Sequence, residues 1–208
     1  FLASEMGYSF VSQFEKAGII TTPKHFIANV ADGGRDSYPI HITERMLREI
    51  YLPPIEACVK RGGSRSIMTA YNSFDGTPCT ANDYLLNDIL KKQMGFNGFV
   101  ISDAGATGGA NVLHYTAADY ADATAKSLQG GLDVIFQTSY THRSMFETPF
   151  FDGRISQQVI DSAVARVLHV KFELGLFEDP SINVTGLDYS VQEQANIDLA
   201  KKAALESL

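Results

Sequence analysis

Four short apolar segments alternate with helical segments along the chain, and this alternation is the strongest constraint on the fold. The apolar segments are 18–26, 65–72, 99–102 and 131–136. Each of them runs into polar side chains at its end. Strand–helix units that follow one another in this way predict a parallel sheet with right-handed crossover connections. We therefore expect an α/β fold.

Two architectures can contain such a parallel sheet. In a (β/α)8 barrel of the TIM type, the loops after the strands form the active site, which agrees with the polar strand ends. A doubly wound sheet would need a phosphate-binding turn after its first strand, and the chain has none there. Four units make about half of a barrel. We predict that residues 1–178 form the C-terminal half of a partial TIM-type barrel, that 179–190 are a linker, and that 191–208 begin a second domain.

The spacing of apolar residues predicts helices, with ends marked by capping residues and glycines. The expected helical ranges are 1–17, 43–61, 82–94, 117–129 and 156–174. Pro53 and Pro54 should end one helix and open the next. Ser156 should cap the last helix, and Gly175 should end it in a left-handed conformation. The glycine-rich residues after Asp103 are expected to form a loop.

Composition and charge exclude several classes of partner. The 208 residues are 45% hydrophobic, which is enough for a substantial core. The net charge is −7 without a basic stripe, and no apolar run is long enough to span a bilayer, so we expect neither a nucleic-acid nor a membrane partner. Cys58 and Cys79 are expected to be separate buried thiols. Because the chain starts at Phe1 and ends within a helical pattern, we expect a piece of a longer protein.

The best candidate for chemistry follows the third apolar segment. That segment stops at Asp103, a lone carboxylate followed by small residues. The ends of the neighbouring strands carry Lys24, His25, Met68 and Tyr71. Because the carboxyl ends of parallel strands meet on one side of a sheet, these side chains should surround one pocket. A carboxylate kept ionised by nearby positive charge can act as a nucleophile, without a metal or cofactor.

The pair Lys24 and His25 raises a question of geometry, because consecutive strand residues point to opposite faces. If both line the pocket, the backbone there must be unusual, and a cis peptide bond between them is the predicted device. Arg35, in the polar loop that follows, is a further candidate ligand. The remaining histidines are expected to be structural or exposed; they are His41, His114, His142 and His169.

Longer motifs connect these candidates. They are Lys-His-Phe at 24–26, Leu-Arg-Glu-Ile-Tyr-Leu-Pro-Pro at 47–54, Met-Thr-Ala-Tyr-Asn at 68–72, and Gly-Phe-Asn-Gly-Phe-Val-Ile-Ser-Asp at 95–103. In order and spacing they closely resemble the second half of the N-terminal barrel of glycoside hydrolase family 3. Residues 172–177 resemble the segment that closes that barrel, and 200–208 resemble the helix that enters the family's second, α/β sandwich domain.

The resemblance implies a retaining, exo-acting β-glycosidase that removes terminal non-reducing sugars, β-D-glucosyl residues first of all. Asp103 matches the family's nucleophile, which forms a covalent glycosyl-enzyme, and the residues at the neighbouring strand ends match positions that line the subsite for the terminal sugar. Retention requires a second carboxyl about 5–5.5 Å away, and in most of the family it is a glutamate of the later domain. The substrate would be a small oligosaccharide or glycoside. Without the rest of the barrel and the second domain, this chain should be nearly inactive.

Departures from the family pattern bear on the substrate. The N-acetylglucosaminidase branch carries a histidine in the loop after Lys-His-Phe, and residues 27–38 contain none. Ala104 stands where some members place an aromatic platform for the sugar, and the chain has no tryptophan. These departures do not decide between glucose and xylose as the terminal sugar, so a β-xylosidase of the same family is an alternative.

Two hypotheses come from other classes of protein. Lys24 could be the Schiff-base lysine of an aldolase-like barrel, but this leaves Asp103 and Tyr71 without a role. An inactive, carbohydrate-binding remnant is the other hypothesis, and the intact Asp103 argues against it. For the complete protein we expect a periplasmic or extracellular location.

Overall fold

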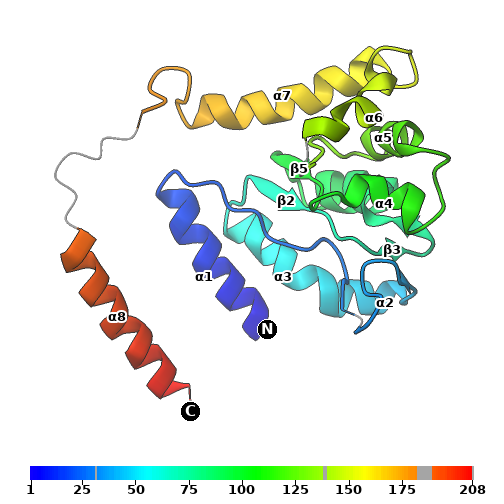
Figure 1. Ribbon diagram of the computed structural model, residues 1–208. Helices are drawn as coiled ribbons and strands as arrows, with labels where there is room; N and C mark the ends of the chain where they lie inside the picture. The colour runs from blue at the N-terminus through cyan, green and yellow to red at the C-terminus, as the bar shows by residue number, and fades with distance from the viewer. Residues whose placement is uncertain (31, 138–139, 182–188, 208) are drawn as a thin grey trace. The chain divides into compact units, whose positions relative to one another are not determined.

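The computed structural model describes residues 1–30, 32–137, 140–181 and 189–207. It separates into two compact units, Phe1–Leu174 and Gly175–Leu208. The first unit has an α/β fold in which short strands lie between helices (Figure 1). The second unit contains helix α8 (Tyr189–Glu206), and residues 182–188 of the predicted linker lie outside the described residues.

Parallel pairing brings four segments of the first unit side by side in chain order. Strand β2 (Ser66–Met68) pairs in parallel with β5 (Phe99–Ile101). A single parallel bridge flanks this pair on each side; the bridges are Phe26–Thr69 and Ile101–Val134. The order of the segments therefore agrees with the predicted succession of strand–helix units.

The predicted strands at 18–26 and 131–136 are reduced to these single bridges. In the first, Pro23 has no N–H to donate to a ladder, and proline is confined to strand edges for that reason. Among the described residues, each segment also has a neighbouring strand on one side only. Among the described residues of this parallel sheet, pairing over several consecutive residues is therefore confined to the central pair, β2 and β5.

Three predicted helices are confirmed, one of them with its predicted caps. They are α1 (Leu2–Lys16), α5 (Tyr120–Gln129) and α7 (Gln157–Glu173). The Ser156 hydroxyl accepts a hydrogen bond from Val159 N (3.4 Å), and Gly175 adopts a φ of 67°. Both ends of α7 thus lie where the capping residues predict.

The predicted loop after Asp103 is instead a helix, α4 (Ala106–Val112). Residues 106–110 are all buried. A Cβ added at Gly108 would lie 2.9 Å from the Tyr120 ring of α5, so the glycine allows the two helices to approach closely. Tertiary packing therefore overrides the low helix propensity of this glycine-rich sequence. A further short helix that was not predicted, α6 (Arg143–Glu147), lies between the 3-10 turns η5 (Tyr140–His142) and η6 (Thr148–Phe150).

The prediction for Pro53 and Pro54 is borne out in part: one helical segment ends at Tyr51 and the next begins at Leu52 with the prolines in its first turn, but the backbone stays helical across the junction. The consecutive segments are α2 (Glu44–Met46), π-helical η1 (Leu47–Tyr51), α3 (Leu52–Glu56) and π-helical η2 (Ala57–Arg61). The residues at the junctions are all in the right-handed helical conformation. The wider π turn of η1 leaves room for proline rings that would clash with the preceding turn of a regular α-helix. The helix predicted at 82–94 is also π-helical, as η4 (Tyr84–Gln93).

A small second sheet lies in the loops of the first unit. Strand β1 (Pro39–Ile40) pairs in parallel with β3 (Ser73–Phe74), which pairs antiparallel with β4 (Thr77–Pro78). The 3-10 turn η3 (Cys79–Ala81) follows. In the part of the chain that the structure describes, no helix combines the length and the apolar character needed to cross a membrane.

The main core lies between the parallel strands and the helices packed on them. Its fully buried members include Phe26, Leu47, Ile67, Leu85, Leu86, Leu90, Val100 and Leu132. Cys58 and Cys79 are buried free thiols, as predicted. Burial raises the pKa of Cys79 to about 12, so this thiol is protonated and unreactive.

A buried ion cluster fastens the fourth parallel segment to two helices. Asp133 Oδ1 accepts hydrogen bonds from Arg166 Nε (2.8 Å) and Nη2 (2.7 Å) of α7, and Asp133 Oδ2 accepts from Val100 N (2.8 Å) of β5. Lys91 Nζ of η4 donates to Gly131 O (2.5 Å) and lies 3.6 Å from Asp133 Oδ1. The Asp133 carboxylate therefore ties the fourth parallel segment to β5 and to α7.

Lys91 makes the stability of this cluster depend on pH. Burial lowers the pKa of Lys91 to about 8, and the Asp133 carboxylate offsets only part of that effect. An unfolded lysine titrates near pH 10.4, so between about pH 8 and 10.5 the unfolded chain binds more protons and stability rises with pH. We expect the wild-type free energy of unfolding, minus that of Lys91→Met, to increase by on the order of 2 kcal/mol across this range. Urea denaturation at several pH values measures the difference.

The control for this prediction is Lys92→Met on the same helix. Lys92 is exposed and pairs with Asp88 (2.7 Å). The hydrogen bond to Asp88 raises the pKa of Lys92. The wild-type free energy of unfolding minus that of Lys92→Met should therefore not increase between pH 8 and 10.5. A wild-type minus Lys91→Met difference that stays constant or falls as the pH rises would refute the prediction.

Candidate active site

Asp103 follows β5 directly and is almost buried, with 7% of its surface exposed. Its Oδ1 accepts a hydrogen bond from Ala104 N (2.7 Å). The turn around it is tied to the fourth segment, because Ser102 Oγ accepts from Phe136 N and Gly105 N donates to Phe136 O, both at 2.9 Å. The carboxylate is therefore held at the carboxyl end of a parallel strand.

His25 lies against this carboxylate, with Nε2 2.9 Å from Asp103 Oδ2. The peptide bond between Lys24 and His25 is cis, which confirms the prediction from the sequence. Burial lowers the pKa of His25, and the positive charges of Lys24 and Arg35 lower it further, against the opposing charge of Asp103. At neutral pH the imidazole is therefore uncharged, with its Nε2 close to the carboxylate oxygen.

Tyr71 approaches the same strand end from the loop after β2. Its hydroxyl donates a hydrogen bond to Ala104 O (3.0 Å). Burial raises the pKa of Tyr71, and the negative charge of Asp103 raises it further. The phenol therefore stays protonated and remains a donor next to Asp103.

The other predicted site residues lie near this group but make fewer contacts. Met68 is the last residue of β2 and is half-buried. Lys24 is exposed, and among the described residues no hydrogen bond or ion pair to its ammonium is seen. Arg35 is also exposed and lies 3.5 Å from Asp36; its charge contributes to the lowered pKa of His25 and offsets part of the rise in the pKa of Tyr71. The roles of these three residues stay predictions.

Two residues at the site were not identified from the sequence. Ser102 precedes Asp103 and anchors the turn through its hydroxyl. The only signal for this role in the sequence is that Ser102 is adjacent to Asp103. His114 Nε2 lies 2.8 Å from Tyr71 O, although the sequence assigned His114 only to the structural or exposed histidines. His41 and His169 are exposed and pair with nearby carboxylates, as that assignment expects.

The chemistry available here is centred on the Asp103 carboxylate. Asp103 can act as a nucleophile or a base, with His25 and Tyr71 as uncharged hydrogen-bond donors beside it. Asp103 Oδ1 accepts one hydrogen bond, from Ala104 N, and each carboxylate oxygen has two lone pairs, so both oxygens can still interact with a reacting atom. Across the described ranges, no three His, Cys, Asp or Glu side chains are grouped so that they could hold a metal ion.

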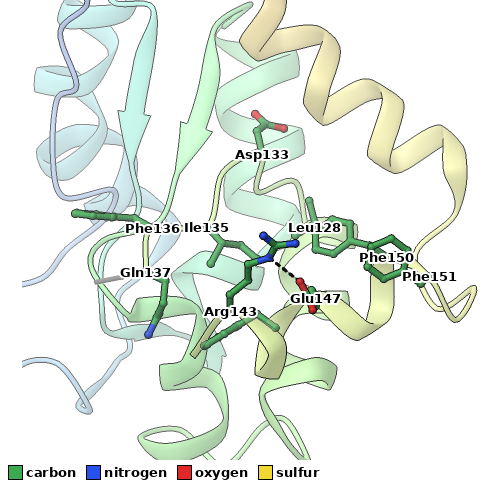
Figure 2. A pocket seen from close by; sticks show the side chains of 10 residues that line it. Leu128, Asp133, Ile135, Phe136, Gln137, Arg143, Glu147, Phe150 and Phe151 are labelled. Carbon is green, nitrogen blue, oxygen red and sulfur yellow. Dashed lines mark hydrogen bonds and ion pairs between the residues drawn. The ribbon is translucent and has the colours of Figure 1, made fainter. Parts of the chain in front are cut away.

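A cavity of about 720 Å³ lies beside residues 133–137 (Figure 2). An ion pair between Arg143 Nε and Glu147 Oε2 (2.7 Å) stands at its wall. The rest of the lining is mostly apolar; it includes Leu128, Ile135, Phe136, Phe146, Phe150 and Phe151. None of the predicted site residues lines this cavity, so it is distinct from the group around Asp103.

Comparison with known proteins places the chain in a family. Residues 1–170 match the sequence profile described as "Glycosyl hydrolase family 3 N terminal domain". The chain belongs to glycosyl hydrolase family 3. The match contains every residue of the candidate site, and the family resemblance inferred from the motifs is thereby confirmed.

Family 3 relatives align with nearly the whole chain. A β-xylosidase from Formosa agariphila is 31% identical over 226 aligned residues, which cover 99% of this chain and 31% of the relative. A periplasmic β-glucosidase from Salmonella typhimurium is 33% identical, with coverage of 86% and 24%. The chain therefore spans only about a quarter to a third of the length of these relatives.

Solved family 3 structures share the fold. A β-glucosidase from Listeria innocua in complex with glucose has a TM-score of 0.78 at 30% identity, covering 92% of this chain and 28% of that one. An exo-β-xylosidase in complex with a xylobiose aziridine activity-based probe has a TM-score of 0.83 at 27% identity, covering 96% and 27%. An α/β fold of the family 3 type is therefore established for this chain.

Proposed function

We propose that the complete protein containing this chain is a retaining, exo-acting β-glycosidase with Asp103 as its nucleophile. The observation that carries the proposal is the buried Asp103 carboxylate after β5, 2.9 Å from His25, in a chain that belongs to family 3. His25, Lys24, Met68, Tyr71 and Arg35 would line the subsite for the terminal sugar, with His25 and Tyr71 as uncharged donors.

The proposed mechanism has two displacement steps. Asp103 attacks the anomeric carbon, the bond to the aglycone oxygen breaks, and an acid protonates that oxygen. Water, deprotonated by the same group, then attacks the anomeric carbon and releases Asp103. The acid must be a second carboxyl about 5–5.5 Å from Asp103, and we place it in a part of the protein outside this chain. The chain alone would then be nearly inactive.

We further propose that residues 1–178 are the C-terminal half of a (β/α)8 barrel. The segments around Phe26, β2, β5 and Val134 lie parallel and in chain order, as successive barrel strands do. The candidate residues stand at their carboxyl ends, which is where barrel enzymes carry their active sites. Residues 179–190 would link this half-barrel to a second domain that begins at 191–208.

β-D-Glucosides are the proposed substrates, and β-D-xylosides are the second candidate. Relatives named for each activity align with most of this chain at similar identity. Xylose lacks the hydroxymethyl group of glucose, so the size of the pocket near that group would separate the two.

A panel of 4-nitrophenyl glycosides tests the function in the complete protein. We expect hydrolysis of the β-glucoside or β-xyloside, no hydrolysis of the α-glucoside, and a product that NMR shows to be the β-anomer before mutarotation. Release of the α-anomer would exclude a covalent glycosyl-Asp103. Borohydride with a carbonyl substrate tests the aldolase alternative, which requires a trapped adduct on Lys24.

A further inference from the structure

A closed ring of contacts surrounds the strand end that carries Asp103. From Asp103 the chain continues through Ala104 into α4 and reaches His114 just beyond the end of that helix. His114 Nε2 lies 2.8 Å from Tyr71 O, and the Tyr71 hydroxyl lies 3.0 Å from Ala104 O. The ring therefore closes on the residue next to the carboxylate.

The His114 end of this ring is well anchored. His114 N donates to Gly109 O (3.0 Å), in the last turn of α4. The turn that follows is bonded back to the same helix, because Thr116 Oγ1 donates to Ala110 O (3.0 Å) and Asn111 Nδ2 donates to Ala117 O (2.9 Å). The imidazole is half-buried and thus has a fixed base from which to reach Tyr71.

The acceptor in the contact between His114 and Tyr71 is a main-chain carbonyl, so Nε2 must carry the proton. This bond ties the Tyr71 backbone to the end of α4. The Tyr71 side chain can then reach Ala104 O and lie beside Asp103.

We propose that His114 is a positioning residue for Tyr71, and through it for Asp103, in the glycosidase reaction proposed above. His114 itself does not touch the carboxylate; it sets the main chain from which the Tyr71 phenol extends. This inference rests on the proposed function, because the reaction it supports is nucleophilic attack by Asp103. Small displacements of a reacting group cost large factors in rate.

The test compares, in the complete protein, His114→Phe, which keeps a ring without a donor, with His114→Gln, whose amide can donate from a similar position. We expect kcat/KM to fall roughly 10–100-fold in His114→Phe, mainly through kcat, and to stay within about threefold of wild type in His114→Gln. His169→Phe, at an exposed histidine of α7, is the control and should leave kcat/KM unchanged. Equal loss in both His114 variants, or wild-type activity in His114→Phe, would overturn the inference.

The same variants in a Tyr71→Phe background show whether His114 acts through Tyr71. If it does, the His114→Phe effect on kcat/KM should shrink to less than about threefold there, because the phenol it positions is gone. Additive losses would contradict the inference.

A readout that does not need activity is the phenolate absorption of Tyr71, one of nine tyrosines, obtained by subtracting the titration of Tyr71→Phe. Burial next to Asp103 raises the pKa of Tyr71, so we expect this titration to move to lower pH in His114→Phe and to stay in place in His114→Gln. An unchanged titration in His114→Phe would overturn the inference. If the wild-type protein hydrolyses no glycoside, the proposed function fails, and the titration still decides whether His114 positions Tyr71.

Discussion

Replacing Asp103 with glycine in the complete protein is expected to lower kcat/KM for 4-nitrophenyl β-glycosides by about 10³-fold or more, which corresponds to roughly 4 kcal/mol of transition-state stabilisation. The reason is that the variant has no group to form the covalent intermediate. Asp103 is nearly buried, and its Oδ2 lies 2.9 Å from His25, so glycine leaves a small space lined by a hydrogen-bond donor. Initial rates at saturating and low substrate concentrations measure the loss.

Azide should partly restore turnover in Asp103→Gly by entering that space and attacking the anomeric carbon. A single displacement inverts the configuration at the anomeric carbon, so a β-glycoside should give the α-glycosyl azide. Asp103→Asn should be as inactive as the glycine variant and should not respond to azide, because the amide fills the space. Asp75→Gly is the matched control, since Asp75 is an exposed aspartate that pairs with His41 away from the site. Unchanged hydrolysis in Asp103→Gly would show that another residue is the nucleophile.

Replacing Asp133 with alanine is expected to lower the free energy of unfolding by about 3–5 kcal/mol. The Asp133 side chain is fully buried and accepts hydrogen bonds from Arg166 and from Val100 N. Without it, Arg166 and Lys91 become poorly compensated cations in a region of low dielectric, and a buried N–H of β5 loses its acceptor. Chemical denaturation followed by circular dichroism measures the change.

The control for Asp133→Ala is Asp88→Ala on η4. Asp88 pairs with Lys92 at 2.7 Å, but its side chain is 40% exposed, so the expected loss is below about 1 kcal/mol. Asp133→Asn should lie between the two, because it removes the charge and keeps an oxygen acceptor. Equal stability of Asp133→Ala and Asp88→Ala would mean that the buried cluster contributes nothing beyond a surface ion pair.

Much of the architecture could be predicted because it depends on local patterns. The alternation of apolar segments and helices predicts the parallel order around β2 and β5, and the cap at Ser156 follows from its side chain. The exceptions depend on neighbours that are distant in sequence. The continuous helical path from η1 into α3 at Pro53 and Pro54 and the burial of the glycine-rich α4 are set by packing, which propensity does not include.

The site shows the same division. The contact between His25 and Asp103 could be expected because both stand at the carboxyl ends of segments of one parallel sheet. The cis bond was the device expected if Lys24 and His25 were both to face one pocket. The contact between His114 and Tyr71 could not be expected in that way. Its acceptor is a backbone carbonyl 43 residues distant, and every residue type offers such a carbonyl.

The one-sided pairing at the margins of the parallel sheet has a practical consequence. The segments at Phe26 and Val134 each leave one row of backbone groups without a strand partner among the described residues. Helix α1 adds exposed apolar side chains at Leu2, Met6 and Phe10. Unpaired edges next to apolar surface are templates for aggregation. For expression and crystallisation, residues 1–208 on their own are therefore expected to aggregate, and the solubility of the first unit depends on whatever shields those edges.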